Sequence, residues 1–151
     1  MEEILINVTP QETRVAVLQQ AVVQELHVEP EDKVLEVGTG SGYLTALLSH
    51  LAAHVTSVEI EPELSLQAAR KLTSHNLENV SVVVGDAANG WGSEQYDVFV
   101  LTGSVPMEPK AFLANLKVGG RLFAVVGDEP VMHARLITRT GPETFEHHTL
   151  F

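Results

Sequence analysis

The 151-residue sequence contains no cysteine, which excludes disulfide bonds, cysteine-ligated zinc and thiol nucleophiles. Basic residues are scarce too: 9 Lys and Arg stand against 20 Asp and Glu, for a formal net charge of -11. Nucleic-acid backbones and anionic membrane surfaces both require clustered basic side chains, so we expect neither as a partner. No apolar run approaches the roughly 20 residues of a membrane-spanning helix. The N-terminus lacks the basic region of a secretion signal, so we expect a cytoplasmic protein.

Apolar residues, by contrast, make up 44% of the chain and gather in short, nearly continuous runs. Such runs are typical of strands that are buried on both faces of a parallel sheet. They lie at residues 33–38, 54–59, 80–86, 96–103 and 120–127.

Helical patterns separate these strands. The first begins after Gly42. The second covers residues 61–76, with Pro62 in its first turn, and the third covers residues 108–116 and is expected to end at Gly119–Gly120. The apolar stripes of the first two helices are Leu44, Leu47, Leu48 and Leu51, and Leu64, Ala68 and Leu72. Strands and helices that alternate at this spacing predict a doubly wound α/β sheet. Residues 132–140 and 144–151 leave no room for a helix between them, so we expect an antiparallel hairpin at the C-terminal end of the sheet.

The pattern of the first 29 residues leaves two structures open. Residues 3–8 are strand-like in either case. Residues 9–28 read as a helix if Thr9 is the N-cap and Glu12 completes a capping box. Its apolar face would consist of Val15, Leu18, Val22 and Leu26. The same residues are β-branched enough for two strands, but the central Gln19-Gln20 has no turn chemistry. We therefore favour the helix.

The stretch Glu36-Val37-Gly38-Thr39-Gly40-Ser41-Gly42 stands where the first buried strand runs into a helix. Glycines allow a tight turn there and let a ligand approach the backbone closely. The start of the helix offers unpaired amides, and ligands bind open α/β sheets at the carboxyl ends of the strands. This turn therefore predicts a ligand site.

Three acids predict which ligand it is. Glu59 ends the second strand and suits ribose hydroxyls, and Asp86 ends the third and suits an adenine amino group. The dinucleotide pattern would need glycine where Tyr43 stands, and the phosphate-binding loop would need a lysine that is absent. Glu36, ahead of the glycines, would repel a pyrophosphate but can face an ammonium group. The combination is typical of S-adenosyl-L-methionine sites.

The segments "DKVLEVGTGSGYLTALLSHLAAHVTSVE", "VVVGDAANGW", "YDVFVLTGSVP" and "LKVGGRLFAVVG" closely resemble the protein-L-isoaspartate O-methyltransferase family, from about residue 30 to residue 151. The resemblance implies a Rossmann-like class I methyltransferase fold with a seven-stranded sheet. It implies S-adenosyl-L-methionine as cofactor, S-adenosyl-L-homocysteine as product, and an isoaspartyl protein or peptide as substrate. The predicted cofactor-binding residues are Glu36, Val37, Gly38, Thr39, Gly40, Ser41, Gly42, Tyr43, Glu59, Ile60, Asp86, Ala87 and Leu101.

Methyl transfer to a carboxylate needs no general base, because a carboxyl group with a reference pKa of about 4 is already ionised at neutral pH. Thr102 and Ser104 follow the fourth strand, where a substrate should meet the methyl group, and they are the predicted catalytic residues. Each also reads as an ordinary loop hydroxyl. We expect no metal site, because His147 and His148 point to opposite faces of a strand. We expect Trp91 to pack in the core or in a lid rather than on the ligand.

The chain departs from the family at both ends. Val8 stands where the family has the serine of a Ser-x-Pro motif, and relatives continue beyond Phe151 with a short tail. Residues 2–29 look similar to the N-terminus of the ribonuclease E/G family, so we expect a leader at residues 1–29 and a methyltransferase core at residues 30–151. Two alternatives to an active enzyme follow: a cofactor-binding but inactive module, and an RNA-associated domain. An exposed substrate face also predicts self-association into a homodimer.

Overall fold

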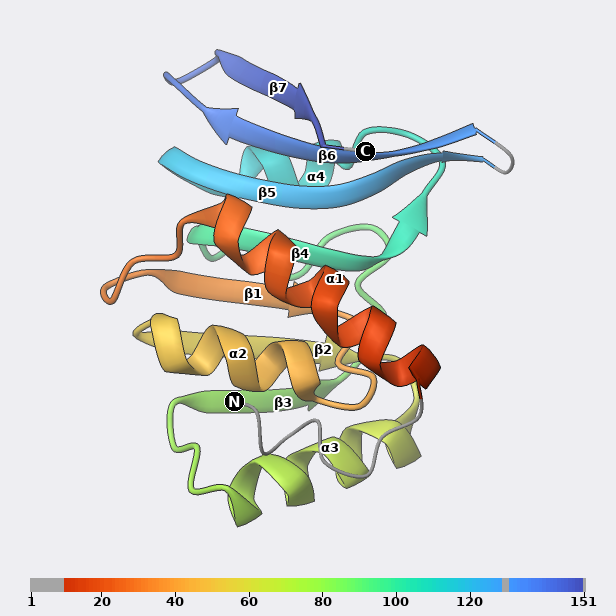
Figure 1. Cartoon of the computed structure of the whole chain (residues 1–151). Helices are drawn as coiled ribbons and strands as arrows, with labels where there is room; N and C mark the ends of the chain where they lie inside the picture. The colour runs from red at the N-terminus through yellow and green to blue at the C-terminus, as the bar shows by residue number, and fades with distance from the viewer. Residues whose placement is uncertain (1–9, 129–130, 151) are drawn as a thin grey trace.

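The structure, a computed structural model, describes residues 10–128 and 131–150, with side chains described from residue 18 onward. The strands in these residues form one seven-stranded sheet (Figure 1). They are β1 (Lys33–Val37), β2 (His54–Glu59), β3 (Val80–Val84), β4 (Tyr96–Val105), β5 (Leu116–Asp128), β6 (Val131–Arg139) and β7 (Phe145–Thr149). Their order across the sheet is β3-β2-β1-β4-β5-β6-β7. Strands β1 to β5 run parallel, β6 is antiparallel to β5, and β7 is antiparallel to β6. The predicted sheet with its C-terminal hairpin is therefore confirmed.

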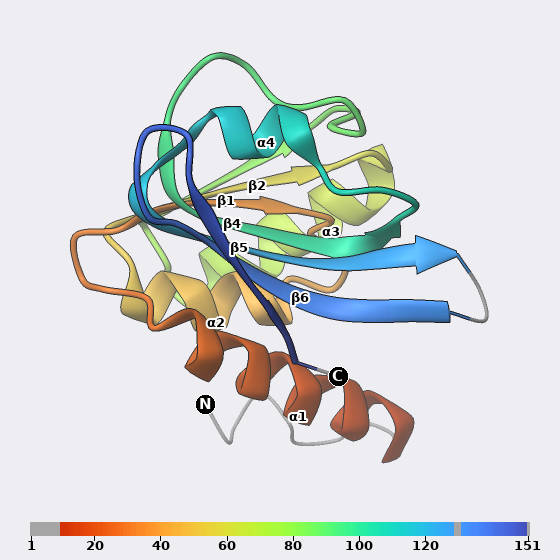
Figure 2. The same ribbon diagram turned by 90° about the horizontal axis from the view of Figure 1, so that it is seen from above.

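Helices cover both faces of this sheet. They are α1 (Pro10–Leu26), α2 (Tyr43–Leu51), α3 (Pro62–Ser74) and α4 (Lys110–Ala114). Figures 1 and 2 show α1 and α2 on one face and α4 on the opposite face. Two core clusters match these two layers: one includes Val22, Leu26, Leu48, Val55 and Val100, and the other includes Leu35, Phe99, Phe112, Leu116 and Ile137. None of the helices in the described part of the chain is long and apolar enough to cross a membrane.

Of the two structures predicted for residues 9–28, the helix is confirmed, because α1 covers Pro10–Leu26. Val22 and Leu26 are buried, but Leu18 is 54% exposed, so its expected place on the buried face is wrong. Steps of four residues rotate by about 40° around a helix, and Leu18 is turned too far from Leu26 to reach the sheet. The expected strand at residues 3–8, the Thr9 cap and the side chain of Val15 lie outside the described residues.

Two further leucines of the predicted stripes are exposed at the ends of their helices. Leu51 is the last residue of α2 and Leu64 lies in the first turn of α3, and each is 41% exposed. The remaining members of both stripes are buried. Helical periodicity selects a face, but burial also requires an opposing element, and at these two helix ends the sheet is not beneath the side chain.

The third helix is shorter than expected, since α4 covers only Lys110–Ala114. Gly119 and Gly120 do not end a helix but lie inside β5, which already begins at Leu116. The β4–β5 register shifts between Tyr96, the partner of Leu116, and Val98, the partner of Arg121. A Cβ on Gly120 would lie 2.7 Å from the carbonyl oxygen of Asp97, so the glycine is required by an irregular strand pairing.

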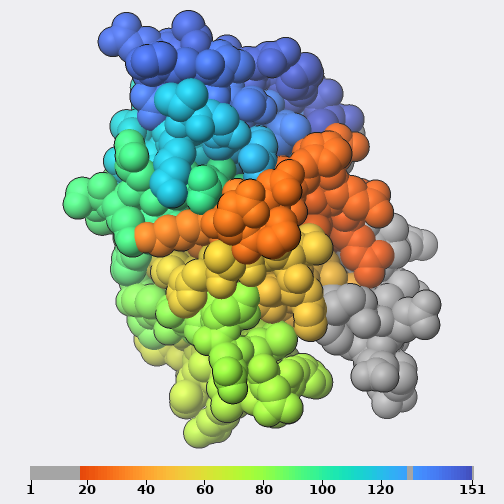
Figure 3. Space-filling model, turned by 90° about the vertical axis from the view of Figure 1, so that its left-hand side faces the viewer, coloured from red at the N-terminus to blue at the C-terminus, as the bar shows by residue number. Residues whose placement is uncertain are grey.

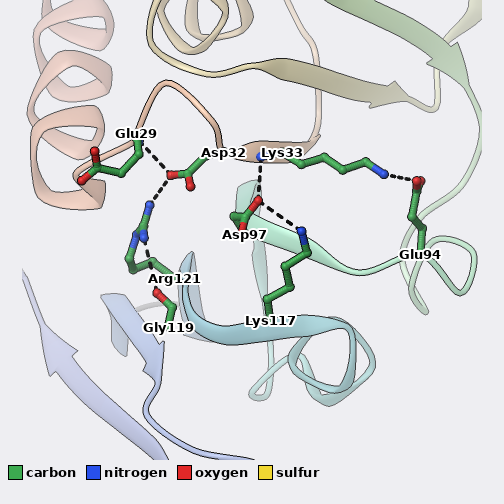
Figure 4. Close-up of polar contacts among 8 residues, drawn as sticks. All are labelled: Glu29, Asp32, Lys33, Glu94, Asp97, Lys117, Gly119 and Arg121. Carbon is green, nitrogen blue, oxygen red and sulfur yellow. Dashed lines mark hydrogen bonds and ion pairs between the residues drawn. The ribbon is translucent and has the colours of Figure 1, made fainter.

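Arg121 anchors the leader helix to the amino-terminal edge of the sheet. Its Nε donates to the carbonyl oxygen of Leu26 at 2.8 Å, and one terminal nitrogen donates to the carbonyl of His27. The same terminal nitrogen forms an ion pair of 2.5 Å with Asp32, whose carboxylate also accepts the amide of Glu29 (Figure 4). Figure 3, which faces this edge, shows the orange segment between α1 and β1 lying across the middle of the surface.

Candidate functional site

The glycine turn joins the end of β1 to the start of α2 at the carboxyl edge of the sheet. Gly38, Gly40 and Gly42 have φ angles of 98°, 54° and 86°, which L side chains rarely adopt. The amide of Gly38 donates to the carbonyl of Val58 at 2.8 Å, which links the turn to β2. Gly42 is the N-cap of α2 and offers no capping side chain. The amide of Tyr43 donates to Ser41 Oγ at 3.4 Å, and the next amides of the helix can serve a ligand.

The three glycines differ in what surrounds them. A Cβ on Gly38 would overlap the hydroxyl oxygen of Thr102, so the backbone of β1 and the side chain from β4 are in close contact. A Cβ on Gly42 would lie 3.5 Å from the Cβ of Ala68 on α3. Nothing lies within 4 Å of the Cβ position on Gly40, which is the open point of the turn.

Glu59, at the end of β2, closes the turn from the side. One carboxylate oxygen accepts the amide of Gly40 at 2.9 Å, and the other accepts the amide of Glu61 at 2.9 Å. Each carboxylate oxygen can accept a second hydrogen bond, so Glu59 can hold the turn and still receive ribose hydroxyls. The sequence predicted the second role only.

Glu36 lies beneath the turn and is fully buried. One of its oxygens, Oε1, accepts hydrogen bonds from Thr45 Oγ1 and from Ser57 Oγ, while Oε2 has no partner among the described residues. Burial raises the pKa of Glu36 to about 7, against the two hydrogen bonds, which lower it, and together with the charge of Glu59, which raises it further. The acid that was expected to face the ammonium group of the ligand is therefore buried, and one of its oxygens has no partner among the described residues.

The predicted catalytic hydroxyls occupy different settings. Thr102 Oγ1 lies 2.9 Å from the carbonyl oxygen of Val37 and 3.0 Å from that of Gly38 and donates its proton to them. Thr102 thus supports the glycine turn. Ser104 is exposed on β4, beyond the register shift between Val100 and Ser104. A catalytic role for either residue stays a prediction.

The remaining predicted cofactor residues divide into exposed and buried groups. Asp86 is exposed, and its Oδ1 accepts the amide of Ala88 at 2.9 Å. Ile60 is 59% exposed beside Glu59. Ala87 and Leu101 are 4% and 3% exposed and belong to the core cluster beneath α4. The half-buried Val37 packs against that same cluster. Glu36, Glu59 and Asp86 therefore line one edge of three adjacent strands, but only two of the three accept protein hydrogen bonds from outside their own turn.

The weaker candidates also have structural explanations. Trp91 is half-buried against the core cluster beneath α4, and its ring lies 2.5 Å from the Cβ position of Gly85, which supports packing. His147 pairs with Glu108 at 2.6 Å and His148 with Glu146 at 3.3 Å. Among the side chains that the structure describes, from residue 18 onward, no group of three His, Asp or Glu could hold a metal ion.

The sequence patterns did not indicate Ser57 and Thr45, the two polar residues that donate to Glu36. Thr39, Ser57 and Thr45 are buried, and Thr39 Oγ1 lies 2.5 Å from Ser57 Oγ. A signal was present, because Ser57 interrupts an apolar strand and Thr45 lies inside the leucine stripe of α2. A hydroxyl inside an apolar pattern must find a partner when it is buried.

The protein-L-isoaspartate(D-aspartate) O-methyltransferase family model matches residues 2–150 of the chain. The chain is 39% identical over 128 residues to the protein-L-isoaspartate O-methyltransferase of Protochlamydia amoebophila, and 44% identical over 115 residues to that of Sodalis glossinidius. These alignments cover 84% and 76% of this chain but 60% and 55% of the relatives. The chain thus spans little more than half the length of these curated relatives.

Solved structures agree with this fold. A protein-L-isoaspartate O-methyltransferase structure matches with a TM-score of 0.69 at 27% identity, over 80% of this chain and 39% of that one. A putative enzyme of this kind from Plasmodium falciparum, in complex with S-adenosyl-L-homocysteine, matches with a TM-score of 0.73 at 16% identity, over 91% of this chain and 69% of that one. The family match begins at residue 2 and so includes the leader, and these comparisons give the ribonuclease resemblance no support.

Proposed function

Because this chain belongs to the protein-L-isoaspartate(D-aspartate) O-methyltransferase family, we propose that it binds S-adenosyl-L-methionine and promotes methyl transfer to the carboxylate of an isoaspartyl residue in a protein or peptide. The observation that carries this proposal is the glycine turn with Glu59 at its side, since the carboxylate of Glu59 accepts the amide of Gly40. The turn places accessible backbone beside a carboxylate, and a ligand with a nucleoside and a charged amino acid part requires both.

The residues present fit this cofactor. The buried Oε2 of Glu36 lacks a partner among the described residues, so an acceptor is available for a positively charged group near the turn. Gly40 leaves room for the cofactor to approach the backbone of the turn closely. Glu59 suits the ribose and the exposed Asp86 suits the adenine amino group, while the exposed, apolar Ile60 next to Glu59 suits the face of the base. The cofactor would supply a methyl group on a sulfonium, from which the acceptor carboxylate takes it.

The chain's own residues would then act by binding and orientation. A carboxylate acceptor has a reference pKa of about 4 and is ionised at neutral pH, so no residue has to remove a proton from it. This agrees with Thr102, whose hydroxyl proton is donated to the backbone of the turn and which therefore holds the turn in place. Holding the two reactants in line accounts for the catalysis that such a site requires.

The chain spans only part of its curated relatives, so recognition of the isoaspartyl substrate is tested separately from cofactor binding. A cofactor-binding but inactive module is the alternative that the experiment must separate. Self-association, a cytoplasmic location and separate leader and core units remain predictions. An RNA-associated role has no observation in its favour, and the charge of -11 opposes it.

The test is calorimetric titration of the full chain with S-adenosyl-L-homocysteine, beside Glu59→Ala and the matched control Glu63→Ala on the exposed start of α3. We expect binding by the wild type and the control, and at least a tenfold loss in Glu59→Ala, as for a charged hydrogen-bonding group. Methylation of an isoaspartyl peptide, with the aspartyl peptide as control, then tests turnover. Binding without turnover would leave the inactive module, and a folded wild type that does not bind would overturn the proposal.

A further inference from the structure

A continuous chain of buried side chains runs beneath the glycine turn. Thr39 Oγ1 lies 2.5 Å from Ser57 Oγ, and Ser57 Oγ donates at 2.6 Å to Oε1 of Glu36. Thr45 Oγ1, from α2, donates to the same oxygen. All four side chains are at most 4% exposed. The chain therefore joins the turn, β2, β1 and α2 within a region that excludes water.

The direction of each hydrogen bond follows from the number of protons. Ser57 has one hydroxyl proton, and because Glu36 offers only acceptors when ionised, that proton points at Glu36. The contact between Thr39 and Ser57 must then be donated by Thr39. Both hydroxyls that reach Glu36 use Oε1, so a proton bound by Glu36 would sit on Oε2, the oxygen that has no partner among the described residues.

The register of the sheet places Ser57 in this chain. Glu36 has Ser57 as its neighbour on β2 and Val100 as its neighbour on β4. From β4 the carboxyl group thus meets an apolar residue, from α2 it meets Thr45, and from α1 the described core residues are apolar. The charged group that acts on it is Glu59 on β2. Ser57 is therefore one of two groups, with Thr45, that stabilise the charge of Glu36.

We propose that Ser57 is a positioning residue of the cofactor site, because its hydroxyl links the carboxyl group of Glu36 to the glycine turn through Thr39. This inference rests on the proposed function, in which Glu36 faces the positive end of the cofactor. One side chain then sets both the placement of the turn and the ease with which the carboxyl group beneath it ionises.

The two parts of this role, placing the turn and favouring the ionised form of Glu36, have different consequences for ligand binding. An ammonium group on the ligand favours the ionised form of Glu36, so binding should strengthen as the pH rises through the range in which Glu36 loses its proton. Removing a hydroxyl that donates to Glu36 should move that range upward. Removing Thr39 should leave the range in place, because Ser57 still donates to Glu36, and should weaken binding equally at every pH.

The experiment has a ligand-free arm and a ligand arm. In the full chain without ligand, the ¹³C resonance of the Glu36 carboxyl group is followed from pH 5 to pH 9 in the wild type, Ser57→Ala, Ser57→Thr, Thr45→Val and Thr39→Val. We expect Ser57→Ala and Thr45→Val to raise the titration midpoint by about one pH unit, as for loss of one hydrogen bond to a charged group. We expect Ser57→Thr and Thr39→Val to leave it unchanged.

In the ligand arm, the affinity for S-adenosyl-L-homocysteine is measured by calorimetry over the same pH range. We expect Ser57→Ala to lose about fivefold in affinity at pH 7, because a pKa that rises from about 7 by about one unit lowers the ionised fraction of Glu36 from about one half to about one tenth, and to recover part of the loss at pH 9. Thr39→Val should lose affinity without a change in the pH profile. Thermal melting of each variant shows that it is folded, and rescue by Ser57→Thr excludes a simple packing defect.

The outcomes distinguish this inference from the proposed function. A wild type that binds, together with a Ser57→Ala variant that moves neither the Glu36 titration nor the pH profile, overturns the role of Ser57 alone. Failure of Ser57→Thr to restore the wild-type profile also overturns it. A wild type that binds no S-adenosyl-L-homocysteine at any pH overturns the proposed function, and the ligand-free titration still decides whether Ser57 sets the charge of Glu36.

Discussion

The hydroxyl of Thr102 donates a hydrogen bond to the carbonyl oxygen of Val37, 2.9 Å away, and so ties the end of β4 to the end of β1. The hydroxyl oxygen of Thr102 also occupies the space that a side chain on Gly38 would need. Thr39 holds the glycine turn from below through its contact with Ser57. Glu59 holds the turn from the side, and Thr102 holds it from the neighbouring strand. Because these contacts differ, substitutions of the individual residues should have different effects.

Gly38→Ala should be far more harmful than Gly40→Ala. Both glycines have positive φ, 98° and 54°, but a Cβ on Gly38 also overlaps Thr102 Oγ1, whereas a Cβ on Gly40 has nothing within 4 Å. An alanine in the left-handed region costs about 1 kcal/mol, and an overlap in a packed site adds about 1–3 kcal/mol. Urea unfolding of the two variants checks the order. Equal losses of unfolding free energy would contradict the close contact between Gly38 and Thr102.

Glu36 should make the protein less stable as the pH rises. Its pKa is raised to about 7 in the folded state from 4.5, so between these values the folded state binds more protons than the unfolded state. The contribution is present below pH 4.5 and is lost as the pH rises through 7, by about 3 kcal/mol in total. Glu36→Gln should remove this dependence.

The measurement for Glu36 is the free energy of unfolding at pH 5 and pH 8, in the wild type, in Glu36→Gln and in the exposed control Glu63→Gln. The control should keep the wild-type difference between the two pH values. A wild type whose stability rises over this range, with the rise absent in Glu36→Gln, would mean that the carboxyl group is stabilised in its charged form.

The parallel strands were predictable because most of them are nearly continuous apolar runs, as expected of strands that are buried on both faces of a sheet. The glycine turn and Glu59 were predictable for a similar local reason, since the turn residues and the strand-end acid are set by position in the chain. The burial of Glu36 was not. Its partners Ser57 and Thr45 lie 21 and 9 residues away and meet it only through strand register and helix packing.

The prediction of where α4 ends was wrong for the same physical reason. Gly119 and Gly120 resemble a helix end, but they lie in β5 because Leu116 pairs with Tyr96 on β4. A glycine required by the approach of a distant carbonyl looks, in the sequence, like one required by a helix cap. Strand pairing overrides the local pattern there.

Arg121→Ala should destabilise the protein by about 2–3 kcal/mol, because it leaves the largely buried carboxylate of Asp32 without its cation and frees the C-terminal end of α1. The matched control is Lys117→Ala. Its ion pair with Asp97 spans 3.5 Å with the lysine side chain 43% exposed, and such pairs contribute less than about 1 kcal/mol. Urea unfolding compares the two. A larger loss in Lys117→Ala would show that Arg121 does not anchor the leader helix.

Gln20 on α1 should stabilise the protein through Tyr43, the first residue of α2. Its side-chain Nε2 donates to the hydroxyl of Tyr43 at 2.9 Å, which fixes the leader helix against the residue that follows the glycine turn. A double-mutant cycle with Gln20→Leu and Tyr43→Phe should give a coupling of about 1 kcal/mol in unfolding free energy, as for a single partly buried hydrogen bond. Gln24→Leu, which changes an exposed glutamine one turn further along α1, is the control and should show no coupling to Tyr43→Phe. If leader and core were independent units, the Gln20–Tyr43 coupling would be zero as well, so this cycle tests directly whether the leader helix is part of the methyltransferase core.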